Sequence, residues 1–135
     1  MKRFDVQGIA LNVSCDEALA LIADPQQLPR WTSAFASVSP GRAVLRTPAG
    51  EVAIELEVES SKQAGTVDWR MRFPDGSVAT AFSRVVPLEA KRCVYSFVLT
   101  PPPVPLEQLE GALASQSRTL ARELERLKAI LESDE

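Results

Sequence analysis

From residue 51 to residue 99 the sequence alternates between apolar and polar positions, as β-strands with one buried face do. The clearest stretch is 51–59, where valine, isoleucine and leucine alternate with four glutamates. Asp75-Gly76 marks a tight hairpin turn between two of these stretches. The sequence therefore predicts a run of antiparallel strands, and together with two earlier strands the predicted ranges are 3–13, 42–47, 51–59, 67–73, 77–86 and 92–99.

Two short helices are predicted between the first strand and the rest. Ser14 and Glu17 have the spacing of a capping box, in which each side chain satisfies a backbone N–H of the other. The helix that follows ends at Asp24-Pro25, because the residue before a proline avoids the helical conformation. Leu28, Trp31 and then Phe35 indicate a second short helix.

A long amphipathic helix is predicted from Pro105 to the C-terminus. Leucines recur along it at steps of three and four residues, apart from a gap at Gln116 and Ser117. These two polar residues either line a space between the helix and the sheet or lie at the edge of the apolar stripe. The stripe consists of Leu106, Leu109, Leu113, Leu120, Leu124, Leu127 and Leu131.

The loops between the later strands predict how these strands pair. The predicted pairs are Glu59 with Thr66, Phe73 with Val78, and Val86 with Cys93. This register gives the sheet an inner face made of Val52, Ile54, Leu56, Val58, Val67, Trp69, Met71, Phe73, Thr80, Phe82, Arg84, Tyr95, Phe97 and Leu99. The glutamates at 55, 57 and 59 then lie on a solvated outer face, opposite arginines.

Composition and charge exclude several classes of function. The net charge of −3 argues against nucleic-acid binding, and the chain has no histidine, the commonest general base and metal ligand. No cofactor and no metal are expected. Cys15 and Cys93 lie far apart in sequence and read as reduced core thiols of a cytoplasmic protein, with a redox or nucleophilic role as the alternative. No stretch approaches the roughly 20 apolar residues of a membrane span.

The order of elements and one local motif carry a resemblance to a known superfamily. The segment Asp24-Pro25-Gln26-Gln27-Leu28-Pro29-Arg30-Trp31 is similar to a motif after the first helix of bacterial polyketide cyclase/dehydrase-like proteins. Over its whole length, 1–135, the chain resembles one domain of the START-like (SRPBCC) superfamily. The resemblance implies an α+β helix-grip fold, in the order β-α-α-β-β-β-β-β-β-α, with a curved antiparallel sheet wrapped around the C-terminal helix. It further implies a cavity between sheet and helix for a hydrophobic ligand.

Arg84 is the most distinctive candidate residue, because the predicted register places it on the inner face between Val67 and Tyr95. A buried arginine needs a partner, so it could anchor a carboxylate, phenolate or carbonyl beside the Tyr95 hydroxyl. Alternatively, its head group reaches water near the end of the strand. The expected ligand-binding residues are Thr80, Arg84, Tyr95, Trp69, Met71, Phe82, Phe97, Leu113, Gln116 and Ser117.

Three classes of function follow. The first is binding of a small hydrophobic or aromatic molecule. The second is a polyketide cyclase/aromatase or dehydratase-like enzyme, in which Arg84, Tyr95 or Ser117 would have to move the proton. The third is a module that binds a protein partner, and homodimerisation is left open.

Overall fold

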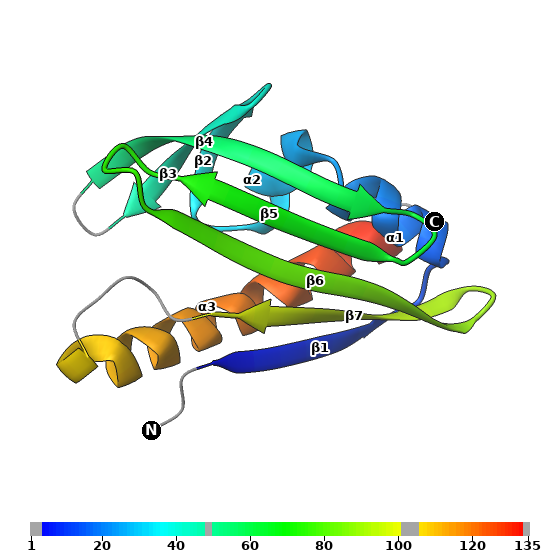
Figure 1. The fold of residues 1–135 in the computed structure, drawn as a ribbon. Coiled ribbons are helices and arrows are strands. Elements are labelled where there is room, and N and C mark those ends of the chain that lie inside the picture. The colour runs from blue at the N-terminus through cyan, green and yellow to red at the C-terminus, as the bar shows by residue number, and fades with distance from the viewer. Residues whose placement is uncertain (1–3, 48–49, 101–105, 134–135) are drawn as a thin grey trace.

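The computed structural model describes residues 4–47, 50–100 and 106–133, and over 106–113 it describes the backbone only. Seven antiparallel strands form one curved sheet in the order β1-β7-β6-β5-β4-β3-β2, and α3 lies against one face of it (Figure 1). The strands are β1 Asp5–Leu11, β2 Phe35–Ser39, β3 Arg42–Thr47, β4 Gly50–Ser61, β5 Thr66–Arg72, β6 Val78–Glu89 and β7 Arg92–Leu99. The helices are α1 Cys15–Ile22, the 3-10 turn η1 Pro25–Gln27, α2 Leu28–Trp31 and α3 Leu106–Ser133. The helix-grip order that the resemblance implies is confirmed, and β2 is a strand that none of the ranges predicted from the sequence covers.

The predicted start of α1 is also confirmed. The Ser14 hydroxyl accepts the Glu17 N–H at 3.2 Å and so satisfies one of the free donors of the first turn. The Asp24 carboxylate similarly accepts the Gln26 N–H at 3.0 Å and begins η1. These two caps turn the chain from β1 towards α2, which buries Leu28 and Trp31 at one end of the sheet.

The core lies between the sheet and the apolar stripe of α3. Leu120, Leu124, Leu127 and Leu131 are all buried, as the leucine spacing predicts. The predicted Pro105 start and the side chains of Leu106, Leu109 and Leu113 lie outside the described residues. On the sheet side, the core centres on an aromatic cluster of Trp31, Trp69, Tyr95 and Phe97.

The register of β4 against β5 differs from the prediction by two residues. Leu56 faces Met71 rather than Trp69, and Glu55 faces Arg72 rather than Arg70. A shift of two keeps every side chain on its predicted face. The outer face therefore still carries opposite charges, with Glu55 3.3 Å from Arg72.

The predicted register of β6 is wrong by one residue, so the side chains predicted to point inward point outward and the others point inward. The β5–β6 turn has three loop residues: the Phe73 N–H donates to the Ser77 carbonyl and the Gly76 N–H to the Phe73 carbonyl, both at 2.9 Å. Gly76 at φ +89° gives the left-handed residue that such a loop requires. Arg84 consequently faces Thr66 rather than Val67.

The inversion of β6 exchanges its two faces. Ala79, Ala81, Ser83 and Val85 belong to the inner face, because they pair with inward residues of β5 and β7. Thr80, Phe82 and Arg84 belong to the outer face, contrary to the prediction, and Phe82 is 44% exposed. The error arose because the larger apolar side chains of β6 are on its outer face and smaller ones are on its inner face.

Strands β2 and β7 differ in how well the sequence predicts them. Phe35 begins strand β2 and does not continue the second helix, which ends at Trp31. On β7 the predicted inward residues are right, since Cys93, Tyr95 and Phe97 are buried, with Val85 opposite Tyr95.

Candidate functional site

A cavity of about 350 Å³ lies between the sheet and α3, and we call it the sheet–helix cavity. Inward residues of β5, β6 and β7 form one wall, α2 and the start of β2 close one end, and α3 forms the opposite wall. Its lining is mainly apolar and aromatic, as in small-molecule sites. The lining residues include Leu28, Trp31, Phe35, Leu45, Trp69, Met71, Phe73, Ala79, Ala81, Phe97, Gln116, Thr119, Leu120 and Glu123.

Small side chains on the sheet and a gap in the leucine stripe of α3 leave this space open. On the sheet, Ala79 and Ala81 occupy positions where larger inward residues would reach α3. On the helix, Gln116 and Thr119 stand where the leucine stripe is interrupted, and close packing resumes at Leu120. Protein interiors otherwise leave few voids larger than a water molecule, so this space is a feature of the architecture.

Aromatic rings form one side of the cavity. Trp69 and Phe97 stack with ring centroids 5.9 Å apart, and Trp31 lies 6.3 Å from Trp69. Tyr95 packs edge-on against Trp31 behind this wall and is itself fully buried. Among the described residues, the indole N–H groups of both tryptophans and the Tyr95 hydroxyl find no hydrogen-bond partner.

Glu123 is the charged residue among the described lining of the cavity, and it was not among the predicted site residues. Its carboxylate accepts the Ser33 N–H, which ties α3 to the loop between α2 and β2. Burial raises the pKa of the Glu123 carboxyl, while the Ser33 N–H and the charges of Arg126 and Arg122 act in the opposite direction. The signal in the sequence is its spacing, since Glu123 follows Thr119 and Leu120 by one helical turn, although the nearby Arg122 and Arg126 are typical of a solvated helix face.

The structure separates the predicted site residues into three groups. Trp69, Met71, Phe97 and Gln116 line the sheet–helix cavity, and Thr80 borders it at the end of β6. Tyr95 packs behind the aromatic wall, and burial raises the pKa of its phenol well above the ordinary value. Phe82, Arg84 and Ser117 lie away from the cavity. The side chain of Leu113 is outside the described residues.

Arg84 does not enter the cavity. It is exposed on the outer face, where its Nε donates to the Ala64 carbonyl at 3.2 Å. Its predicted role as an inward anchor for an anionic group is therefore wrong. The alternative prediction, that the Arg84 head group reaches water, is correct. The reason is the register of β6, however, and not a position near the end of the strand.

Ser117 joins α3 to β1 instead of lining the cavity. The Gln7 side-chain amide donates to the Ser117 carbonyl at 2.7 Å and to its hydroxyl at 2.9 Å. The Ser117 hydroxyl in turn donates to the carboxylate of Asp5, a residue only 9% exposed. This polar junction fixes the helix against the edge strand.

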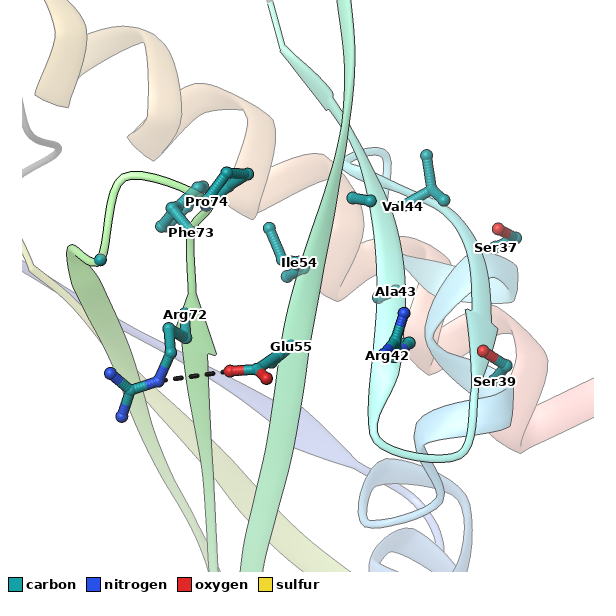
Figure 2. A pocket seen from close by; sticks show the side chains of 12 residues that line it. Ser37, Ser39, Arg42, Ala43, Val44, Ile54, Glu55, Arg72, Phe73 and Pro74 are labelled. Carbon is teal, nitrogen blue, oxygen red and sulfur yellow. Dashed lines mark ion pairs between the residues drawn. The ribbon is translucent and has the colours of Figure 1, made fainter.

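A second hollow of about 540 Å³ lies where β4 extends past the end of β5, and we call it the β4 groove. Figure 2 shows the ion pair between Glu55 and Arg72 on one side of it, with Ser37, Ser39 and Arg42 on the other side. The Glu55 and Arg72 side chains are 67% and 56% exposed, so water screens their charges. The groove is larger but suits an apolar molecule less well than the sheet–helix cavity.

The two cysteines are both free, and they lie close to each other. Cys15 is the first residue of α1, and Cys93 is on β7. Burial raises the pKa of the Cys93 thiol to about 11, and the neighbouring Cys15 adds to this rise. The nucleophilic form of cysteine is the thiolate, so Cys93 is a poor nucleophile at neutral pH.

No protein-family model matches the chain, and no curated protein matches it. Solved structures do resemble it. A START superfamily protein from Mycobacterium smegmatis aligns with a TM-score of 0.71 and 12% identity, over 99% of this chain and 100% of that one. The di-domain ARO/CYC protein BexL has a TM-score of 0.70 and 19% identity over 97% of this chain, which spans 47% of BexL. The Zhui aromatase/cyclase from a Streptomyces species has a TM-score of 0.65 and 12% identity, over 97% and 92% of the two chains.

These likenesses show that the chain has the START-like helix-grip fold. At such identities they concern the fold, and function must be argued from the site. Within the described residues, no helix is long and apolar enough to cross a membrane.

Proposed function

We propose that the protein binds a small hydrophobic or aromatic molecule in the sheet–helix cavity. The observation that carries this proposal is the cavity itself, about 350 Å³ of space walled by Trp31, Trp69, Met71 and Phe97 beneath α3. Burial of an apolar ligand there removes its surface from water, at about 25 cal/mol per Å². Ligand pockets of roughly 300–1,000 Å³ are the usual size for such molecules.

The fold neighbours support a second candidate, an enzyme of the cyclase/aromatase or dehydratase type. Two of the neighbours bear the names ARO/CYC and aromatase/cyclase. Glu123 is the observation in this chain that favours the enzyme, because a carboxyl with a raised pKa in an apolar cavity can move a proton. Arg84, Tyr95 and Ser117, the groups expected for this chemistry, do not line the cavity.

The tryptophans offer a direct test of binding. The chain has two tryptophans, and both line the sheet–helix cavity. The neutral dye N-phenyl-1-naphthylamine fluoresces strongly in apolar surroundings, and tryptophan emission can excite it at short range. We expect saturable dye emission on tryptophan excitation, with one dye per chain. Dye emission no stronger than in buffer would contradict the proposal.

A further inference from the structure

We propose that the sheet–helix cavity selects a neutral ligand bearing a hydroxyl group, and that this hydroxyl donates a hydrogen bond to Glu123. This inference rests on the proposed binding function and names the chemistry of the ligand at that site. Glu123 would thus be the residue that determines specificity among apolar molecules of similar shape.

The first support is the incomplete hydrogen bonding of the Glu123 carboxylate. Its Oε2 accepts the Ser33 N–H, and within the described part of the chain no group donates to its Oε1. The side chain is partly withdrawn from water and lines the cavity. A carboxylate has about four acceptor sites, and a desolvated one is stabilised by each donor it gains. A ligand hydroxyl is a donor that fits inside an apolar cavity.

The second support is the charge of the cavity wall. Among the lining residues that the structure describes, Glu123 alone is charged. Arg84, the cation that could have paired with an anionic ligand, is on the outer face. A ligand carboxylate would therefore be desolvated next to another carboxylate, with no cation among the described lining residues to pair with it, which is unfavourable.

The surroundings of Glu123 also favour a neutral donor over a ligand cation. Arg122 and Arg126 are exposed on the same helix, and their positive charges already act on Glu123. A ligand cation would have to lose its hydration on entering the apolar cavity, and Glu123, whose charge is already partly offset by these two arginines, would compensate for that cost only in part. A hydroxyl gains the charge-assisted hydrogen bond without that cost.

Three compounds that differ only at one carbon test the inference: fluorene, 9-hydroxyfluorene and fluorene-9-carboxylate. Each is titrated at pH 8 against the protein loaded with N-phenyl-1-naphthylamine, and its dissociation constant is taken from displacement of the dye. We expect the native chain to bind 9-hydroxyfluorene at least about tenfold more tightly than the carboxylate.

Two variants isolate the role of Glu123. Glu123→Gln keeps the shape and an acceptor for the Ser33 N–H, whereas Glu125→Gln removes the same charge from an exposed position on α3. We expect Glu123→Gln to reduce the ratio of affinities for 9-hydroxyfluorene and fluorene by about five- to tenfold. It should also reduce the ratio of affinities for 9-hydroxyfluorene and the carboxylate. Glu125→Gln should change neither ratio.

The outcomes separate the two proposals. If the dye and fluorene bind but the preference for the hydroxyl is the same in Glu123→Gln as in the native chain, the inference is overturned and the binding function stands. Equal affinity of the native chain for the carboxylate and the hydroxyl compound overturns the inference too, even if Glu123→Gln fails to fold. If neither the dye nor any of the three compounds binds, both proposals fail.

Discussion

Replacement of Gly65 by alanine should destabilise the protein by about 2 to 5 kcal/mol, through backbone strain and steric overlap together. Gly65 has φ +77°, a conformation that side chains disfavour. It also lies against β6, where the Val85 N–H donates to its carbonyl at 2.7 Å. A Cβ atom at this position would overlap the Val85 carbonyl oxygen, which is backbone and moves only if the sheet moves.

Gly76→Ala is the matched control for this prediction. Gly76 also has a positive φ, of +89°, but a Cβ atom there would meet nothing within 4 Å. Its replacement should cost only the conformational strain, about 1 to 2 kcal/mol. Urea unfolding followed by tryptophan emission measures both variants. Equal losses in the two would show that the close approach of Gly65 to β6 contributes nothing.

The second large effect is expected on ligand affinity, from Ala81→Phe. Ala81 is an inward residue of β6 that lines the sheet–helix cavity, so a phenyl ring at this position would occupy the space of the ligand. We expect the dissociation constant of N-phenyl-1-naphthylamine to rise about a hundredfold, equivalent to about 2.7 kcal/mol. Because the ring enters unfilled volume, the free energy of unfolding should change little.

Ala53→Phe makes the same change in the β4 groove. Ala53 is an exposed residue of β4 that lines this groove, so its replacement should leave the dissociation constant of the dye unchanged. The reverse pattern, with affinity lost in Ala53→Phe and kept in Ala81→Phe, would place the ligand in the groove.

The parts of the fold that the sequence predicted well are those with a clear period. The leucine stripe from Leu120 to Leu131 and the alternation over 51–59 each have one apolar face, and both faces are as predicted. The helix-grip order followed from these periods and from the resemblance carried by the segment that begins at Asp24-Pro25.

The register of β6 could not be predicted from alternation, because this strand carries apolar residues on both faces. Val78, Phe82 and Val86 point outward and Ala79, Ala81 and Val85 inward, so hydrophobicity favoured the wrong face. The length of the Pro74–Gly76 loop decided between the two registers by a single residue. Arg84 was predicted on the wrong face because of this difference of one residue in the length of the loop.

The candidate site was therefore predicted only in part. Aromatic residues on a strand with one apolar face, such as Trp69 and Phe97, are expected to form a wall. The spacing of Glu123 places it beside the leucine stripe, but its partial burial depends on the loop at Ser33, about 90 residues away along the chain. The cavity exists because alanines of β6 face Thr119 and Gln116 of α3, a pairing that only the assembled fold shows.

The most direct test of the central claim is an NMR measurement on protein labelled with ¹³C at the methionine methyl groups. The chain has two methionines, Met1 and Met71, and Met71 lines the sheet–helix cavity. With bound N-phenyl-1-naphthylamine, we predict nuclear Overhauser effects between the dye protons and the Met71 methyl group. Saturable binding without these effects, in a sample where the Met71 methyl resonance is resolved and unshifted, would contradict ligand binding in the sheet–helix cavity.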